Sequence, residues 1–156
     1  MLLAAARAPI RPHTRVLAAT IGAVNADVRR GVVVIVQRGE RYLVIRRAPH
    51  VIAPGAWCFV GGAIEPGESE ADAVIREFRE EVGGIVRPLR RIWEYTRPDG
   101  RLHLAWWLAE LVADRLAANP DEVAEYAWHT AAEIECLPNL LDSNRAFLRA
   151  IRELEM

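Results

Sequence analysis

Residues 62–84 decide the fold, and they read GAIEPGESEADAVIREFREEVGG. Ser69 can cap a helix, and Asp72 three residues later completes a capping-box pattern. Gly83 and Gly84 end such a helix, because glycine readily takes the left-handed conformation at a helix C-terminus. The stretch therefore predicts a helix over 69–82 after a loop rich in glycine and proline. At 100° per residue its apolar stripe comprises Ala71, Val74, Ile75, Phe78 and Val82.

A second face of this helix carries three carboxylates, Glu77, Glu80 and Glu81. Like charges at this spacing repel one another and destabilise an isolated helix. A hard divalent cation would relieve the repulsion, because Mg²⁺ prefers oxygen ligands. Arg76 adjoins this face and can orient or neutralise one carboxylate. The alternative interpretation is an ordinary solvated face in which Arg76 pairs with Glu80.

The same stretch resembles the Nudix signature, G-x5-E-x7-R-E-U-x-E-E-x-G-U, in which U is a bulky aliphatic residue. Seven fixed positions match at the right spacing: Gly62, Glu68, Arg76, Glu77, Glu80, Glu81 and Gly83. Such a match arises by chance on the order of once in 10⁸ placements. Phe78 and Gly84 depart from the two aliphatic positions, and Val60 stands where many relatives have proline. These departures concern packing, so the acidic face is complete.

The resemblance implies a role for each matching residue. The implied metal ligands are the Gly61 carbonyl and the carboxylates of Glu77, Glu80, Glu81 and Glu122. Glu122 is chosen because it lies six residues before Trp128, an offset found in mutator-type relatives, and Glu125 is the competing candidate. Glu68 orients Arg76 or a ligand. Glu77 or Glu80 is the general base, so the implied catalytic residues are Glu77, Glu80 and Arg76.

The implied activity is Mg²⁺-dependent hydrolysis of a phosphoanhydride bond by water, with Mn²⁺ as a possible substitute. The leading substrate is a nucleoside triphosphate, cut to monophosphate and pyrophosphate as in the mutator-type branch. ADP-ribose or a nucleotide sugar is the alternative. No run resembles the accessory signatures of the NADH or coenzyme A branches. A third hypothesis is a nucleotide-binding module without catalysis, which the intact acidic run disfavours.

Three residues outside the signature are candidates for substrate binding. Arg46 and Arg47 end a strand near the expected cleft, although a solvated strand end explains them equally well. Asn144 can read a purine edge, because its amide both donates and accepts, but it can also be part of a helix cap. Several aromatic residues could stack a base, although most are expected in the core: Trp93, Tyr95, Trp106, Trp107 and Trp128.

The rest of the chain alternates strands with short helices. Apolar runs at 31–37 and 41–46 flank Arg38-Gly39-Glu40, and runs at 89–96 and 101–112 flank Arg97-Pro98-Asp99-Gly100, so each pair predicts a hairpin. Residues 54–67 predict a loop containing a short strand, 123–129 a weaker strand and 131–136 a helical turn. A final helix is expected over 142–154, capped by Asp142 or Ser143, with Phe147, Leu148, Ile151 and Leu154 on its apolar side. This order favours the α+β class, with a mixed sheet in a Nudix-type α/β/α sandwich.

Composition narrows the remaining possibilities. The 156 residues fit one domain, expected over 27–156, with 1–26 as an arm or extra strand. A net charge of −1 suggests neither nucleic-acid nor membrane-surface binding. The resemblance implies a small nucleotide as the partner. Arg7, Arg11 and Arg15 without any acidic residue before Asp27 permit a targeting signal, but Arg7 and Pro9 interrupt the apolar stretch. Two distant cysteines, Cys58 and Cys136, favour a cytoplasmic protein without a disulfide framework or zinc site. A homodimer is possible, as in many relatives.

Overall fold

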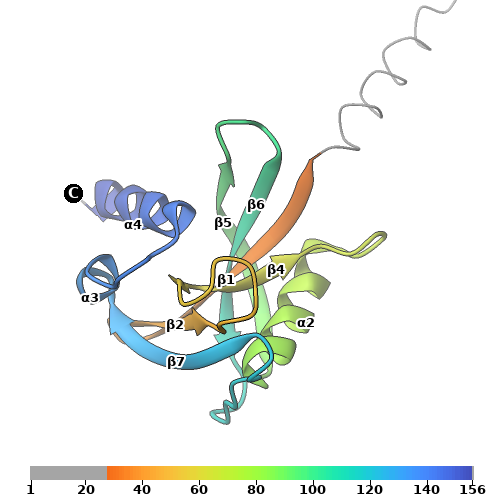
Figure 1. Cartoon of the computed structure of the whole chain (residues 1–156), viewed down its shortest axis with the longest axis vertical. Helices are drawn as coiled ribbons and strands as arrows, with labels where there is room; N and C mark the ends of the chain where they lie inside the picture. Colours follow the sequence, from red (N-terminus) through yellow and green to blue (C-terminus); the bar gives the residue numbers. More distant parts are fainter. Residues whose placement is uncertain (1–27, 156) are drawn as a thin grey trace, which may run out of the picture.

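The computed structural model describes residues 28–155 (Figure 1). The elements are β1 (Arg29–Arg38), β2 (Arg41–Arg47), β3 (Trp57–Cys58), β4 (Val60–Ala63), α2 (Glu70–Val82), β5 (Val86–Thr96), β6 (Leu102–Leu111), β7 (Val123–Thr130), α3 (Ala131–Glu135) and α4 (Asp142–Glu155). Residues 1–26, for which the sequence predicts an arm or extra strand, lie outside the described residues. Among the described helices, none combines the length and apolar composition needed to cross a bilayer.

The seven strands form a mixed sheet, as expected. Its main order is β3-β2-β1-β6-β5, with β4 pairing to β1 and β7 to β2. Strand β1 runs parallel to β6 and antiparallel to β4. A parallel partner requires a crossover, and α2 lies on the connection between β4 and β6. Because β4 precedes α2 and pairs with β1, the segment that leads into α2 lies beside β1.

Strand β1 is covered on both faces, which explains its unbroken apolar sequence. Val32, Val34 and Val36 face one hydrophobic cluster, which includes Phe78 of α2. Val33 and Ile35 face a second cluster, which includes Phe147 of α4. Since successive residues of a strand point to opposite faces, the two helices pack on opposite sides of the sheet, as Figure 1 shows. The expected α+β sandwich is confirmed.

Helix α2 begins and ends close to the predicted positions. The Ser69 hydroxyl accepts a hydrogen bond from the Asp72 backbone N–H, and Gly83 ends the helix in the left-handed conformation at φ 65°. The apolar stripe is only partly as predicted. Val74, Phe78 and Val82 are buried, whereas Ala71 and Ile75 are half-buried and Ala73 takes a core position.

Both predicted hairpins and the strand over 123–129 are present. The 54–67 loop holds two short strands, β3 and β4, rather than one. Two predictions for α4 are wrong. Asp142 and Ser143 lie within the helix, where the Leu141 carbonyl accepts from the Asn144 and Arg145 backbone N–H groups. Leu154 is exposed, because the last turn extends beyond the sheet.

Candidate active site

The acidic face of α2 is turned inward. The whole residues Glu77 and Glu81 are only 7% and 5% exposed. The glycines of β4 allow this close approach, because a Cβ on Gly62 would lie 2.3 Å from the Glu77 carboxyl carbon. A Cβ on Gly61 would lie 2.3 Å from the Val32 carbonyl oxygen of β1. Glycine at 62 is therefore required by the close approach of Glu77, and glycine at 61 by the close approach of β4 to β1.

Arg76 joins the loop to the helix through a network of hydrogen bonds. Its Nε donates to Glu68 Oε1 at 2.7 Å and its Nη2 to Glu68 Oε2 at 2.9 Å. Its Nη1 donates to Glu77 at 2.8 Å and to Glu80 at 3.1 Å. Its Nη2 also donates to the Ala63 carbonyl at 2.8 Å. The guanidinium therefore fixes β4, the following loop and two helix carboxylates relative to one another.

Glu68, which Arg76 holds, and Glu81, which Arg76 does not contact, have opposite pKa shifts. The hydrogen bonds from Arg76 lower the pKa of Glu68 to about 2 and keep it ionised. Burial and, to a smaller extent, the charges of Glu77 and Glu122 raise the pKa of Glu81 to about 8, although a hydrogen bond from the Gly61 N–H opposes the shift. Burial also raises the pKa of Glu77, although Arg76 opposes this shift. Arg76 already pairs with Glu68, so Glu77 and Glu81 would together carry more negative charge than Arg76 neutralises when ionised, and their burial favours the neutral forms.

This donor set fits a hard divalent cation in its chemistry. Carboxylate and carbonyl oxygens are the ligands that Mg²⁺ takes, and a cation would offset the excess negative charge. Within residues 28–155, no three acidic, histidine or cysteine side chains already stand in positions that could hold a metal ion. Arg76 Nη1 donates to Oε1 of Glu77 and the Gly61 N–H to Oε2 of Glu81, so each carboxylate keeps its other oxygen for a cation.

The structure separates the two candidates for the additional carboxylate. Glu122 lies close enough to Glu77 and Glu81 for its charge to raise the pKa of both. Glu125 instead forms an ion pair with Arg46 at 2.9 Å. The backbone of Glu122 is held by Ala48 N–H, which donates to its carbonyl at 2.9 Å. Of these two residues, Glu122 is therefore the one whose charge acts on the carboxylates of α2.

The three candidate substrate residues lie in different environments. Arg46 is paired with Glu125, whereas Arg47 Nε donates to the Ile52 carbonyl at 2.6 Å and its charge reaches Glu81. Asn144 is 3% exposed, and its Oδ1 accepts from the Phe59 backbone N–H at 2.8 Å. Asn144 is therefore not a helix cap but a link between α4 and the β3–β4 segment. Arg47 is the one of the three that lies beside the acidic site.

The aromatic residues are mostly structural. Trp106 is fully buried and stacks on Phe147 with ring centroids 4.4 Å apart. Trp107 Nε1 donates to Glu70 at 2.8 Å, a link between β6 and the start of α2 that the sequence did not indicate. The guanidinium carbon of Arg38 lies over the Trp128 ring, 4.4 Å from the centroid of that ring. Cys58 is buried, and burial raises the pKa of its thiol to about 12, in agreement with the expected small apolar residue.

A family profile and curated relatives both match most of this chain. The profile of the NUDIX domain family matches residues 27–151. Two curated relatives are both named NAD-capped RNA hydrolase NudC. The one from Stutzerimonas stutzeri (strain A1501) is 32% identical over 106 residues, and the one from Chromobacterium violaceum 34% identical over 107. The alignments cover 68% and 69% of this chain but 38% of each relative, so the chain spans well under half the relatives' length.

Solved structures resemble the whole described fold. The solution structure of the E. coli ORF135 protein has a TM-score of 0.68 and 26% identity, over 83% of this chain and 91% of that one. The crystal structure of the MutT protein from Methanosarcina mazei Go1 has a TM-score of 0.70 and 20% identity, over 82% and 95%. These similarities agree with the mixed sheet and helices described above.

Proposed function

The chain belongs to the Nudix family and is a Nudix hydrolase, and from this premise we propose Mg²⁺-dependent hydrolysis of a phosphoanhydride bond in a nucleoside diphosphate derivative. The proposed metal ligands are the Gly61 carbonyl and the carboxylates of Glu77, Glu80, Glu81 and Glu122. The observation that carries the proposal is the cluster of buried carboxyls on α2, where Glu77 and Glu81 are 7% and 5% exposed and burial raises the pKa of Glu81 to about 8. A divalent cation bound there would favour the ionised carboxylates that burial alone disfavours.

The roles of the side chains follow from their positions. A divalent cation held by the carboxylates supplies neutralisation of the diphosphate and activation of water. Glu77 or Glu80 accepts the proton of the attacking water, and the Glu80 side chain is 47% exposed and so open to solvent. Arg76, held by Glu68, positions both of these carboxylates. Arg47 lies beside Glu81, where its charge can pair with a substrate phosphate.

The proposed substrate is a nucleoside triphosphate, released as monophosphate and pyrophosphate. The support is the mutator-type resemblance around residues 46–69. ADP-ribose and nucleotide sugars are the alternatives. The name of the curated relatives adds NAD-capped RNA as a further candidate substrate, because it contains a dinucleotide pyrophosphate. Those relatives are much longer than this chain. We propose small nucleotides rather than nucleic acid, because the chain has a net charge of −1. A cytoplasmic location is proposed on its two free cysteines.

A substrate panel tests this function directly. Purified protein is incubated with nucleoside triphosphates, ADP-ribose, nucleotide sugars, NAD and NAD-capped RNA, with Mg²⁺, with Mn²⁺ or with EDTA. We expect turnover of triphosphates to monophosphate and pyrophosphate, dependent on the metal. Preference for NAD or the capped RNA would replace the proposed substrate while retaining the chemistry. Binding of a nucleotide without any turnover would contradict catalysis and favour a binding module.

A further inference from the structure

Glu70, the first residue of α2, contacts three strands of the main sheet. Its Oε2 accepts a hydrogen bond from Nε1 of Trp107 in β6 at 2.8 Å. Two guanidiniums also lie near its carboxylate, that of Arg91 in β5 at 3.7 Å and that of Arg30 in β1 at 3.5 Å. The strands β1, β6 and β5 are neighbours in the sheet, so one carboxylate links the start of the helix to all three.

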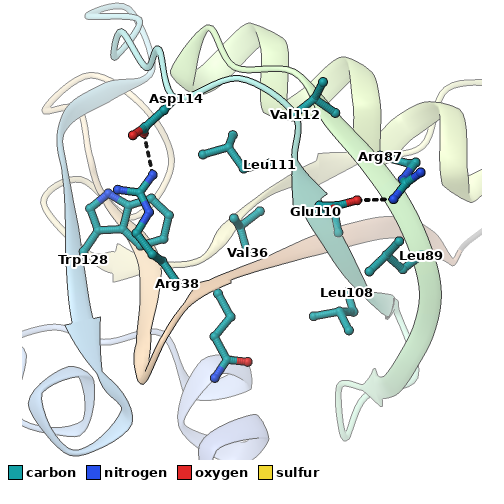
Figure 2. Close-up of a pocket in the computed structure, with 12 residues that line it drawn as sticks. Val36, Arg38, Arg87, Leu89, Leu108, Glu110, Leu111, Val112, Asp114 and Trp128 are labelled. Atoms are coloured by element: carbon teal, nitrogen blue, oxygen red, sulfur yellow. Dashed lines mark hydrogen bonds and ion pairs between the residues drawn. The ribbon is translucent and has the colours of Figure 1, made fainter.

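These contacts differ from the ordinary ion pairs on the same strands. The Glu70 side chain is 19% exposed, and Trp107 packs against the hydrophobic cluster that includes Phe78 of α2. Figure 2 shows an ordinary pair, Arg87 of β5 with Glu110 of β6, and both of these side chains are more than half exposed. Water screens a pair of that kind, whereas a hydrogen bond at the edge of the core keeps more of its strength.

Arg30 connects this contact to the segment that leads from β4 into α2. Its backbone carbonyl accepts a hydrogen bond from the Ile64 N–H at 2.9 Å. Arg76, from the middle of the helix, donates to the preceding carbonyl, that of Ala63, at 2.8 Å. The segment is therefore tied to β1 and to α2 at its beginning, and Glu70 lies where it enters the helix.

Glu70 lies on the same face of α2 as the buried carboxyls. Glu77 is seven residues further along the helix and Glu81 eleven, so at 100° per residue each lies within about 20° of Glu70 around the helix axis. At the far end of this face, the Gly61 N–H donates to Glu81 Oε2 at 3.2 Å. One face of the helix is therefore held against the sheet at its first residue and again in its last turn.

The carboxyls on this face are sensitive to small rotations of the helix. An α-helix with its side chains has a radius of about 5–6 Å, so a rotation of about 10° moves a carboxylate by about 1 Å. A displacement of that size at a reactive centre can cost on the order of a hundredfold in rate. We propose that Glu70 is a positioning residue, whose hydrogen bond from Trp107 sets the rotation of α2 and so places Glu77 and Glu81 for the metal. The inference rests on the proposed function, in which those two carboxylates bind the metal.

Asp72 provides the matched control for the charge of Glu70. An acidic residue in the first turn of a helix interacts favourably with the helix dipole, whatever else it contacts. Both residues lie in the first turn of α2, but Asp72 is exposed, whereas Glu70 is half-buried against Trp107. Asp72→Ala therefore removes a charge from the same turn without removing the hydrogen bond to the sheet.

The first test needs neither metal nor substrate. In the metal-free full chain, the amide signal of Gly61 in a ¹H–¹⁵N spectrum reports on its hydrogen bond to Glu81. Glu70→Ala removes the acceptor and Trp107→Phe the donor, so both should shift this signal and speed exchange of the Gly61 N–H by about tenfold, the typical effect of one hydrogen bond. Glu70→Gln keeps an acceptor oxygen and should retain the wild-type signal, as should Asp72→Ala. An unchanged Gly61 signal in Glu70→Ala would overturn the inference, as would equal shifts in Glu70→Ala and Glu70→Gln.

The second test measures turnover of a nucleoside triphosphate against Mg²⁺ concentration. Loss of a residue that orients metal ligands typically costs about 10–100-fold in metal affinity or activity. Because Glu70 acts through the helix, Glu70→Ala should lie at the lower end, with kcat reduced about tenfold and a higher half-saturating Mg²⁺ concentration. Glu70→Gln and Asp72→Ala should stay close to wild type. The double variant Glu70→Ala/Trp107→Phe should lose no more kcat than the worse single variant, because both changes break one hydrogen bond.

Urea denaturation of the same variants separates positioning from a merely structural role. A Glu70→Ala variant that is less stable but keeps the wild-type kcat and Mg²⁺ dependence would overturn the inference. Absence of turnover in the wild type would instead contradict the proposed function, and the Gly61 amide signal would then decide the role of Glu70 by itself.

Discussion

The carboxylate site of α2 and the exposed surface of strands β5 and β6 both contain arginine–glutamate pairs. The pairs differ in how deeply they are buried and in whether their charges balance. At the carboxylate site, Arg76 forms ion pairs with Glu68, Glu77 and Glu80, while the buried Glu81 carboxyl accepts a hydrogen bond from the Gly61 backbone N–H. On the exposed surface of β5 and β6, Arg87 and Glu110 form an ion pair, and their side chains are 68% and 52% exposed. Burial of several carboxyls around one guanidinium suits the binding of a cation, whereas an exposed ion pair whose charges balance needs no further ligand.

The largest effect should come from removing the buried carboxyl. Glu81→Gln should lower kcat by about a thousandfold, equivalent to roughly 4 kcal/mol of lost transition-state stabilisation. The metal-free variant should be at least as stable as the wild type at neutral pH, because burial raises the pKa of Glu81 to about 8 and so costs the wild type stability above pH 4.5, whereas a neutral amide does not titrate. Steady-state kinetics and urea denaturation measure the two quantities. Near-wild-type turnover would mean that Glu81 does not bind the metal.

A smaller effect should distinguish the two carboxylates before Trp128. Glu122→Gln should lower kcat by about a hundredfold, because its charge lies close to Glu77 and Glu81. Glu125→Gln should retain most of the activity, because Glu125 pairs with Arg46 on the surface. The two variants are compared under identical Mg²⁺ concentrations. The reverse order of effects would assign the additional ligand to Glu125.

The next effect concerns the ion pair that holds Arg76. Arg76 lowers the pKa of Glu68 from 4.5 to about 2, so this pair stabilises the fold above pH 4.5 and loses its effect as pH falls toward 2. Glu68→Gln should therefore cost about 2 kcal/mol at neutral pH and flatten the acid side of the stability profile. Glu65→Gln is the control, because Glu65 is exposed and lies 3.8 Å from Arg76. Equal acid profiles for wild type and Glu68→Gln would contradict this account.

The smallest effect on stability should come from removing the exposed ion pair between Arg87 and Glu110. Arg87→Ala should change the free energy of unfolding by less than about 0.5 kcal/mol, because solvent screens an exposed ion pair. Chemical denaturation of the variant beside wild type measures this difference. A loss of several kcal/mol would show that the pair supports the fold of the single chain, and the contrast with the carboxylate site would no longer hold.

Local signals predicted the elements around the site but not their burial. Ser69 and Gly83 bound α2 as expected, because capping depends on residues within one turn. The helical wheel placed Glu77 and Glu81 on a polar face, for which solvent exposure is the ordinary expectation. They are buried because Gly61 and Gly62 of β4 and the segment carrying Glu122 pack against that face. Asn144 shows the same limit, since its partner, Phe59, is 85 residues away.

The sequence by itself determined the Nudix signature, the capped helix and the spacing of the carboxylates, because these depend on residues a few positions apart. Tertiary structure alone decided that Arg76 holds Glu68 and two helix carboxylates at once. It also decided that the charge of Glu122 rather than that of Glu125 acts on Glu81, and that Glu70 meets Trp107 of β6. The physical reason is that burial, and with it charge compensation and pKa, depends on which distant segments exclude water from a side chain.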